Sequence, residues 1–452
     1  MKQIFKSAVA ASLIFSAAAG ASAQNRSAYF TDNYTYRFML NPAFANEKGF
    51  LSMPALGQLN MATQGNVGID NFLYVVNGKT TTFMNPDVSA SEFLGGLKDR
   101  NRLGFNTKVG VLAVGFNAFR GYNTVSVNMN GDLAFSMPKS VFSLLKQGVE
   151  NRTYDISDFD AHASAYVEVA LNHSRQITSQ LRVGAAVKFL VGAGNIDINM
   201  KKAHLALGEN DWDVLTNAEI QANLAGLRYQ TEYSKETGRD YVSGMDMDHM
   251  GVGGYGLAFD LGATYELNDD WRFSLAFNDL GFISWKNNVV ASTQGDRTFR
   301  LSDYTLDPAD MEGSFDDMED RLYTLYQLDN LGDKGSRTRA IAATMNVGAE
   351  YVFPLYRPLT FGLLNTTRIA GDFTWTDFRL SAQVRPVKCL SAAVNYGIGT
   401  FGSSFGWVLN LSTTGFNLYF GMDHTLGTLT KQGIPLNPNS QVSVGINFPF
   451  GR

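Results

Sequence analysis

The sequence is poor in the residues that build metal centres, disulfides and helical membrane spans. Among its 452 residues there is one cysteine, Cys389, which excludes an internal disulfide and any zinc site built on several cysteines. The five histidines are scattered without metal-ligand spacing. After Gln24 no apolar run approaches the roughly 18 residues that indicate a spanning helix. Lysine and arginine form no concentrated basic stripe. The sequence therefore predicts no metal, no cofactor and no nucleic-acid partner.

What the chain does have is a two-residue alternation of apolar and polar side chains that recurs from end to end. In residues 255–267, for example, Tyr255 and Leu257 lie on the face opposite Asp260 and Glu266. Many such segments, joined alternately by tight turns and long loops, are typical of a barrel with lipid outside and a polar lumen. We therefore expect an all-β fold, a transmembrane antiparallel β-barrel of about 14 strands, with 16 as the alternative.

The N-terminus has the features of a secretory signal peptide. Lys2 and Lys6 precede a mostly apolar stretch at residues 8–19, and Ala-Ser-Ala at residues 21–23 forms a small-residue cleavage site. The alternative, an uncleaved anchor, is disfavoured because the apolar stretch is shorter than the ~20 residues of a spanning helix. We expect residues 1–23 to be removed and the chain to be exported to the outer membrane.

The alternation also gives the expected strand boundaries. Residues 50–62 and 65–75 are expected to form a first hairpin, and residues 214–227 fit either a strand or a helix. The other strands are expected at residues 103–120, 122–137, 161–173, 181–198, 252–267, 271–286, 341–353, 359–369, 372–385, 389–399, 404–412, 415–424 and 441–450. No composition break divides the chain, so residues 49–452 are expected to form one barrel.

Aromatic residues and breaks in the alternation give further expectations. Trp271 and Trp285 fall on the same face near opposite ends of one strand, which predicts anchors at the two membrane interfaces. Asp279 falls on the apolar face of that strand, and the apolar face changes between Trp375 and Phe378. A β-bulge would explain either break, because one inserted residue shifts the register.

Charged residues on the polar faces are expected to point into the lumen. This set comprises Asp132, Arg182, Lys188, Asp260, Glu266 and Glu350. Two strings resemble catalytic motifs, G-x-G-x-x-G at residues 251–256 and G-x-S-x-G at residues 402–406. Both lead into strand patterns, whereas a dinucleotide site or a nucleophile elbow requires a following helix. We predict no catalytic residues and no enzyme activity.

Two insertions are expected to lie outside the cell. Residues 138–149 read as a short amphipathic helix, and the 288–337 insertion carries a second one at residues 315–328. The first half of the second insertion is acidic, which favours a solvated loop over a divalent-cation site.

The mature N-terminus carries a family resemblance. Ser-Ala-Tyr-Phe at residues 27–30, Tyr-Thr-Tyr-Arg at residues 34–37 and Leu-Asn-Pro-Ala-Phe at residues 40–44 resemble the opening of a Bacteroidota outer-membrane family of unknown function. The Asn41-Pro42-Ala43 step is also similar to the N-terminal plug of FadL-type long-chain fatty-acid transporters. This resemblance implies that residues 24–48 fold into the lumen as a hatch. Residues 442–450 resemble the C-terminal strand signal that outer-membrane assembly machinery reads.

Two functions remain open at this stage. The FadL-type resemblance implies passage of a hydrophobic small molecule across the outer membrane, with an apolar pocket under the hatch. The mixed charges expected in the lumen do not favour a wide open pore, and they would also suit a narrow barrel closed by salt bridges. The alternative is a scaffold or secretion-associated barrel that binds protein partners through its long loops. In both cases the other expected partners are outer-membrane lipid and the assembly machinery.

Overall fold

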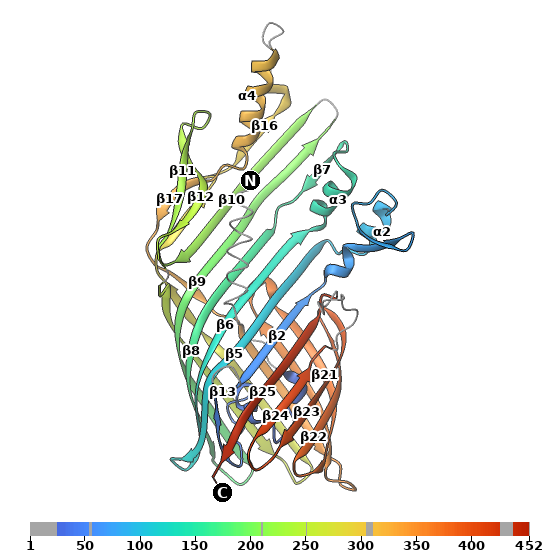
Figure 1. The fold of residues 1–452 in the computed structure, drawn as a ribbon, viewed down its shortest axis with the longest axis vertical. Helices are drawn as coiled ribbons and strands as arrows, with labels where there is room; N and C mark the ends of the chain where they lie inside the picture. The colour runs from blue at the N-terminus through green and yellow to red at the C-terminus, as the bar shows by residue number, and fades with distance from the viewer. Residues whose placement is uncertain are drawn as a thin grey trace.

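The protein is a closed antiparallel barrel of 14 strands, and strands make up 64% of the part of the chain that the structure describes. The computed structural model describes residues 25–53, 57–208, 211–249, 251–303, 311–424 and 437–451 (Figure 1). The predicted signal peptide at residues 1–23 lies outside the described residues. Within the described residues, no helix has the length and apolar character needed to cross a membrane.

Neighbours along the chain pair in order around the wall, and the C-terminal strand closes the ring on the first one. The wall strands are β1 (Gly49–Ser52) with β2 (Gln58–Gly65), β5 (Arg100–Ala118), β6 (Gly121–Pro138), β8 (Phe159–Gln176), β9 (Leu181–Leu207), β13 (Gly254–Glu266), β14 (Trp271–Trp285), β19 (Ala343–Val352), β20 (Leu359–Ile369), β21 (Trp375–Val387), β22 (Leu390–Gly399), β23 (Gly402–Ser412), β24 (Asn417–Met422) and β25 (Ser440–Phe450). Strand β25 pairs with both β1 and β2, which in turn pair with β5. The expected fold class is confirmed.

The two faces of the wall have opposite chemistry, as a membrane barrel requires. On β13, Leu257, Phe259 and Leu261 are each more than two-fifths exposed, whereas the neighbouring Ala258 and Asp260 are buried. The outward apolar residues form the surface that faces lipid. The inward surface is rich in buried asparagine, including Asn60, Asn128, Asn278, Asn346, Asn410 and Asn447.

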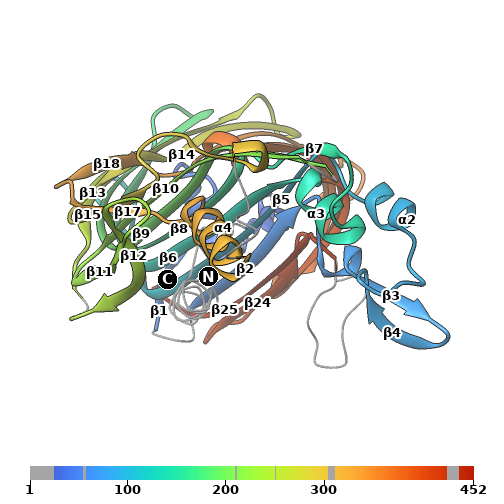
Figure 2. The ribbon, with the colours of Figure 1, turned by 90° about the horizontal axis from the view of Figure 1, so that it is seen from above.

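The expected first hairpin is wrong. Residues 49–65 form one wall strand that is split into β1 and β2, and both halves pair with the same two neighbours. The chain then leaves the wall, and β3 (Leu73–Val76) pairs only with β4 (Lys79–Thr82) in a separate two-stranded sheet. Asn77 and Gly78 both have positive φ, as the tight turn of such a hairpin requires. Figure 2 shows this hairpin beside the barrel.

A bulge at Asp279 changes which face of β14 meets the lumen. The pairing of β13 with β14 shifts by one residue at this point, and Asp279 has a φ of 61°. The bulge expected here is confirmed. Because one extra residue reverses the alternation, Trp285 is buried inside, with 2% of its surface exposed, while Trp271 is 40% exposed on the outside. The expectation that both tryptophans anchor the membrane interfaces is therefore wrong.

The second expected bulge, near Trp375, is wrong. Strands β20 and β21 keep one register from Arg368 opposite Trp375 to Leu359 opposite Val384. Trp375 faces inward because it pairs with a charge, and its ring lies 4.8 Å from the guanidinium carbon of Arg26. In the sequence, an aromatic residue on the lumen face therefore looks as if the apolar residues had switched to the other face of the strand.

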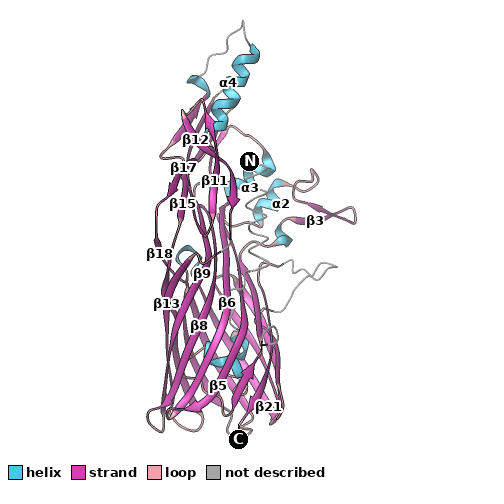
Figure 3. Cartoon of the chain, turned by 60° about the vertical axis from the view of Figure 1, so that its left-hand side comes forward, coloured by secondary structure: helices cyan, strands magenta, loops and turns pink. Residues whose placement is uncertain are grey.

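The two ends of the barrel differ in length. At one end the strands are joined by short turns, such as residues 268–270, and at the other end β9 and its neighbours rise well beyond the rest of the wall (Figures 1 and 3). In outer-membrane barrels the short turns are periplasmic and the long loops are extracellular. The ambiguous residues 214–227 fall mainly in a strand, β10 (Trp212–Leu224).

The long-loop extension has its own small apolar cores. It contains β7 (Arg152–Asp155), β10, β11 (Leu227–Ser234), β12 (Arg239–Met247), β15 (Asn288–Ser292), β16 (Arg297–Arg300), β17 (Asp329–Asp333), β18 (Arg337–Ala340), α3 (Lys139–Gln147) and α4 (Met311–Thr324), with α2 (Ala90–Gly95) beside α3. Both expected amphipathic helices are present, although α4 begins and ends four residues earlier than expected. Met318, Leu322 and Leu325 pack with Tyr154 and Phe299 in one of these cores.

Candidate functional site

The lower lumen is filled by residues 25–48, called here the plug segment. It contains two short helical turns, Arg26–Ala28 and Thr35–Met39, which lie inside the barrel in Figure 3. Its aromatic side chains form an apolar core with a few wall residues: Tyr29, Phe30, Tyr34, Tyr36, Phe38 and Phe44 with Phe50, Tyr122 and Tyr419. The plug segment thus supplies an apolar core inside a wall that is mostly polar.

Neutral wall side chains hold the backbone of the plug segment. Asn278 and Asn346 each donate a hydrogen bond of 2.9 Å from Nδ2 to the carbonyl oxygen of Leu40. Ser174 Oγ donates to the carbonyl oxygen of Ala43 at 2.6 Å. Each such bond contributes about 1 kcal/mol net, because water can replace the partner when the segment leaves.

The Asn41-Pro42-Ala43 step approaches the wall where the wall has no side chain. Asn41 accepts a hydrogen bond from the amide of Ala43 at 2.9 Å and donates to the carbonyl oxygens of two wall residues. A Cβ added at Gly262 would lie 2.1 Å from Asn41 Oδ1, and one added at Gly184 would lie 2.1 Å from the Pro42 oxygen. These two glycines therefore admit the turn, and any larger residue would displace it.

A buried ion pair fixes the N-terminal end of the plug segment. Arg26 Nε lies 3.0 Å from Asp423 Oδ2, and Arg26 Nη1 lies 3.0 Å from Asp377 Oδ2. Ser27 donates from both its amide and its hydroxyl to the other oxygen of Asp423, at 2.7 and 2.6 Å. Arg379 bonds Asp377 at 2.8 Å. The charges therefore compensate one another inside the barrel, which a buried ion pair requires.

A second group of charges lies at the Asp279 bulge. Lys188 Nζ is 2.6 Å from Asp279, 2.7 Å from Asp260 and 3.8 Å from Glu168. Lys108 is 3.3 Å from Glu168. All five side chains are at least nine-tenths buried, so each charge depends on its neighbours for stabilisation. We call these five residues the Lys188 cluster.

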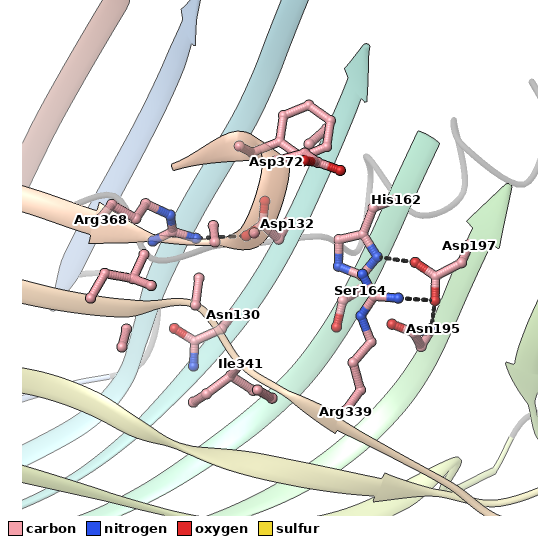
Figure 4. A pocket seen from close by; sticks show the side chains of 18 of the residues that line it. Asn130, Asp132, His162, Ser164, Asn195, Asp197, Arg339, Ile341, Arg368 and Asp372 are labelled. Carbon is pink, nitrogen blue, oxygen red and sulfur yellow. Dashed lines mark hydrogen bonds and ion pairs between the residues drawn. The ribbon is translucent and has the colours of Figure 1, made fainter. Parts of the chain in front are cut away.

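The upper lumen contains a cavity of about 670 Å³. One side of it, formed by β6, β8 and β9, is polar and presents Asn130, Asp132, Asp160, His162, Ser164, Asn195, Asp197 and Asn199. The opposite side, from β14 and β18–β20 with the turn after β20, presents the apolar side chains of Trp285, Ile341 and Phe373 together with Arg339 and Arg368. The cavity reaches solvent at the long-loop end, because Gly371 and Asp372 line it and are exposed. Figure 4 shows the polar residues and Ile341 facing the same space.

Ion pairs cross the lumen at this level. Arg368 of β20 lies 2.6 Å from Asp132 of β6, although the two strands are not neighbours in the wall (Figure 4). Asp197 of β9 forms an ion pair with Arg337 at 2.7 Å, and it also pairs with Arg339. These contacts brace the upper barrel from within.

Asp197 has the most complete set of partners at the cavity. Its Oδ1 lies 2.8 Å from His162 Nδ1, and its Oδ2 accepts from Asn195 at 3.0 Å and forms ion pairs with the two arginines. The outward side chain next to it, Ile196, packs against Ala222, Leu224 and Leu227 of the long-loop extension, so Asp197 lies beyond the lipid-facing belt. Burial by itself raises the pKa of Asp197, but the hydrogen bond and charge of His162 and the charge of Arg339 hold that pKa below its ordinary value.

The structure places the six expected lumen charges at three heights. Asp132 lines the cavity, and Lys188 and Asp260 belong to the Lys188 cluster below it. The other three lie near the short-turn end: Arg182 Nη1 is 3.4 Å from Ser174 Oγ, and Arg272 lies 3.4 Å from Glu266 and 3.2 Å from Glu350. Glu350 is buried, whereas Glu266 is exposed at the rim. The six residues therefore do not form one site.

Several site residues were missed by the sequence reasoning. Arg368 and Arg379 alternate with apolar neighbours and could have been assigned to the lumen from that signal alone. His162 and Asp197 lie where β9 has passed a bulge near Gly194, which reverses the inward face. Arg339 of β18 lies between the expected insertion at residues 288–337 and the expected strand at residues 341–353.

The fold and the cavity define a membrane-spanning β-barrel with an internal plug segment and a cavity of mixed polarity above it. The chain belongs to a family described as a family of unknown function (DUF5723), whose sequence profile matches residues 42–423. No curated protein has a significantly similar sequence. The expected Bacteroidota origin stays a prediction.

Similar solved structures include two toluene transporters. The chain is 11% identical to TbuX of Ralstonia pickettii, with 91% of this chain and 92% of that chain covered and a TM-score of 0.41. It is 10% identical to TodX of P. putida over 92% and 93% of the chains, with a TM-score of 0.41. A FadL homologue of Pseudomonas aeruginosa is 11% identical over 90% and 91%, with a TM-score of 0.32. These values carry no argument about a ligand, and the fold rests on the strand pairing above.

Proposed function

We propose that this protein is an outer-membrane channel that takes up a small amphipathic molecule from outside and passes it to the periplasm when the plug segment moves. The observation that supports this most directly is the cavity of mixed polarity in the lumen above the plug segment. On β14, Asn278 bonds the plug segment, and Gly281, three residues further along, lines the cavity. A molecule in the cavity would therefore lie on the path that the plug segment closes, with the Lys188 cluster between the two.

The lining favours an amphipathic molecule over a purely apolar one. The FadL-type resemblance implied an apolar pocket, but nine of the 26 residues that line this cavity are carboxylates, amides or arginines. A hydrocarbon would cover these groups without replacing their contacts with water, which costs free energy. A molecule with one apolar face and one polar face meets both sides of the cavity.

Movement of the plug segment can be tested by locking it with a disulfide. A Cβ added at Gly406 would lie 2.6 Å from Ser27 Oγ, within reach of a disulfide between cysteines at these positions, and 2.8 Å from the carbonyl oxygen of Asp423, so the backbone must shift slightly to admit the cysteine. The variant Ser27→Cys/Gly406→Cys would be made with Cys389→Ser, because Cys389 is exposed and would react. The full chain would be reconstituted into liposomes that enclose three small aromatic solutes, one neutral, one anionic and one cationic.

We expect release of at least one solute under reducing conditions and its loss on oxidation. Cys389→Ser alone, under both conditions, controls for effects of the oxidant on the barrel. Equal release from the oxidised and reduced double variant would contradict a path that the plug segment closes. No release from either form, in liposomes shown to contain folded barrel, would contradict passage altogether.

A scaffold function through the long loops is the alternative. The 315–328 region was the feature that favoured it, but Met318, Leu322 and Leu325 pack into the extension itself. That packing favours the interpretation of this region as a folded cap and disfavours a free docking surface. Removing residues 300–330 should leave solute release intact if the channel function is right, and should abolish capture of a protein partner if the scaffold function is right.

A further inference from the structure

The charges that line the cavity already have partners. Asp132 pairs with Arg368, and Asp160 lies 3.0 Å from Arg100. Asp197 pairs with Arg337 and Arg339 and is bonded by His162 and Asn195. Asp372 is exposed to solvent at the mouth. A charged ligand would therefore have to break an internal ion pair before it gained a partner of its own.

The neutral amides of the same wall are in the opposite situation. Asn130 is 2% exposed, and neither its Nδ2 nor its Oδ1 has a hydrogen-bond partner among the described residues. Asn195 is 1% exposed, and within the same residues its Oδ1 also lacks a partner. Both residues line the cavity, and Figure 4 shows Asn195 near Ser164 and Asn130 near Ile341. Buried polar groups without a partner are costly, so a ligand that satisfies them gains binding free energy.

Hydroxyl groups match this pattern better than charged groups. An amide presents a donor and an acceptor, and a hydroxyl can accept from the first and donate to the second. The opposite side of the cavity offers apolar contact from Trp285 and Ile341, which suits the C–H face of a sugar ring or an attached apolar group. The cavity volume of about 670 Å³ lies within the range of small-molecule sites.

We propose that the cavity selects an uncharged, hydroxyl-rich molecule with one apolar face, of the chemical class of a small glycoside. This inference rests on the proposed function and names its substrate class. Asn130 and Asn195 bind the hydroxyl groups, and Trp285 with Ile341 contacts the apolar face.

The test compares four probes that share one aromatic ring: phenyl β-D-glucoside, benzoate, benzylammonium and toluene. The full chain is kept in a detergent that carries no sugar headgroup, and binding is measured by calorimetry. We expect the glucoside to bind at least tenfold more tightly than each of the other three. Tighter binding of either ion overturns the inference about charge, and tighter binding of toluene overturns the need for hydroxyl groups.

A matched pair of variants locates the site. Asn130 and Asn60 both lie opposite Lys108 in the wall, both are buried, and both have two unpartnered amide atoms, but only Asn130 lines the cavity. Asn130→Leu should weaken glucoside binding at least tenfold, and Asn60→Leu should change it less than twofold. Equal effects of the two changes would overturn the assignment of the site. The ranking of probes on the unmodified chain needs neither variant to fold.

The result also separates this inference from the proposed function. If benzoate or benzylammonium is released from liposomes through the unlocked plug segment while the glucoside is not, the channel stands and the substrate class is wrong. If the glucoside binds but no solute is released in either state of the disulfide, the site stands and passage is wrong. If none of the four probes binds, the inference fails.

Discussion

Replacing Lys188 by methionine should destabilise the barrel far more than removing an exposed lysine. Lys188 Nζ lies 2.6 Å from Asp279 and 2.7 Å from Asp260, and each contact is worth roughly 6 kcal/mol in Coulomb energy at an effective dielectric constant of 20. Most of this gain offsets the cost of taking the ions out of water. Removal of one partner nevertheless leaves buried charge uncompensated, at a cost of about 3–5 kcal/mol.

The assay is urea unfolding of the protein in lipid vesicles, followed by tryptophan fluorescence at neutral pH. Lys201→Met is the matched control, because Lys201 also pairs with a carboxylate, Glu219 at 2.9 Å, but is exposed; its loss should cost less than about 1 kcal/mol. Adding Asp260→Asn and Asp279→Asn to Lys188→Met should restore most of the lost stability. A loss as small as that of the control, or no recovery in the triple variant, would refute this account of the cluster.

Three further predictions follow from the plug segment, the cavity and the bulge. Gly262→Ala places a Cβ 2.1 Å from Asn41 Oδ1, so it should displace the plug segment and raise ion conductance in planar bilayers; unchanged conductance would contradict this. Asp197→Asn should lower the unfolding temperature at pH 7, and the difference from the unmodified chain should shrink as pH falls below about 4, because the lowered pKa of Asp197 stabilises the fold only while the carboxyl is ionised. A difference in unfolding temperature that does not change with pH would contradict this prediction. Brominated lipid should quench Trp271 but not Trp285, so that Trp271→Phe lowers the quenched share of the tryptophan fluorescence and Trp285→Phe raises it.

The barrel could be predicted from the sequence because each wall strand carries its own signal. The alternation of lipid-facing and lumen-facing residues is local, and it recurs from β5 to β25 wherever a strand crosses the membrane. It failed after β2, where the local turn at Asn77 and Gly78 pairs two short strands away from the wall. The two-residue alternation of apolar and polar side chains does not distinguish a wall strand from a strand of such a hairpin.

The cavity could be predicted only in part, because its contacts join residues that are far apart along the chain. Alternation assigns Asp132 to the lumen, but nothing near it identifies Arg368 as its partner across the barrel. The bulge at Asp279 was visible as a break in the pattern, but its consequence for Trp285 required the register of β13 against β14. One inserted residue therefore moved a large aromatic side chain from the expected lipid face to the lining of the cavity.

The chemistry of the lumen separates the part of the protein that must stay rigid from the part that must move for passage. Charged contacts within the wall, such as that of Lys188 with Asp260, are costly to break because both partners are buried. Apart from the ion pairs of Arg26 and Asp32, the plug segment is held by neutral contacts, in which Asn278, Asn346 and Ser174 donate to its carbonyl oxygens, and water can substitute for each. A wall braced by charge around a segment held mainly by neutral groups can keep its shape while that segment exchanges protein contacts for hydration.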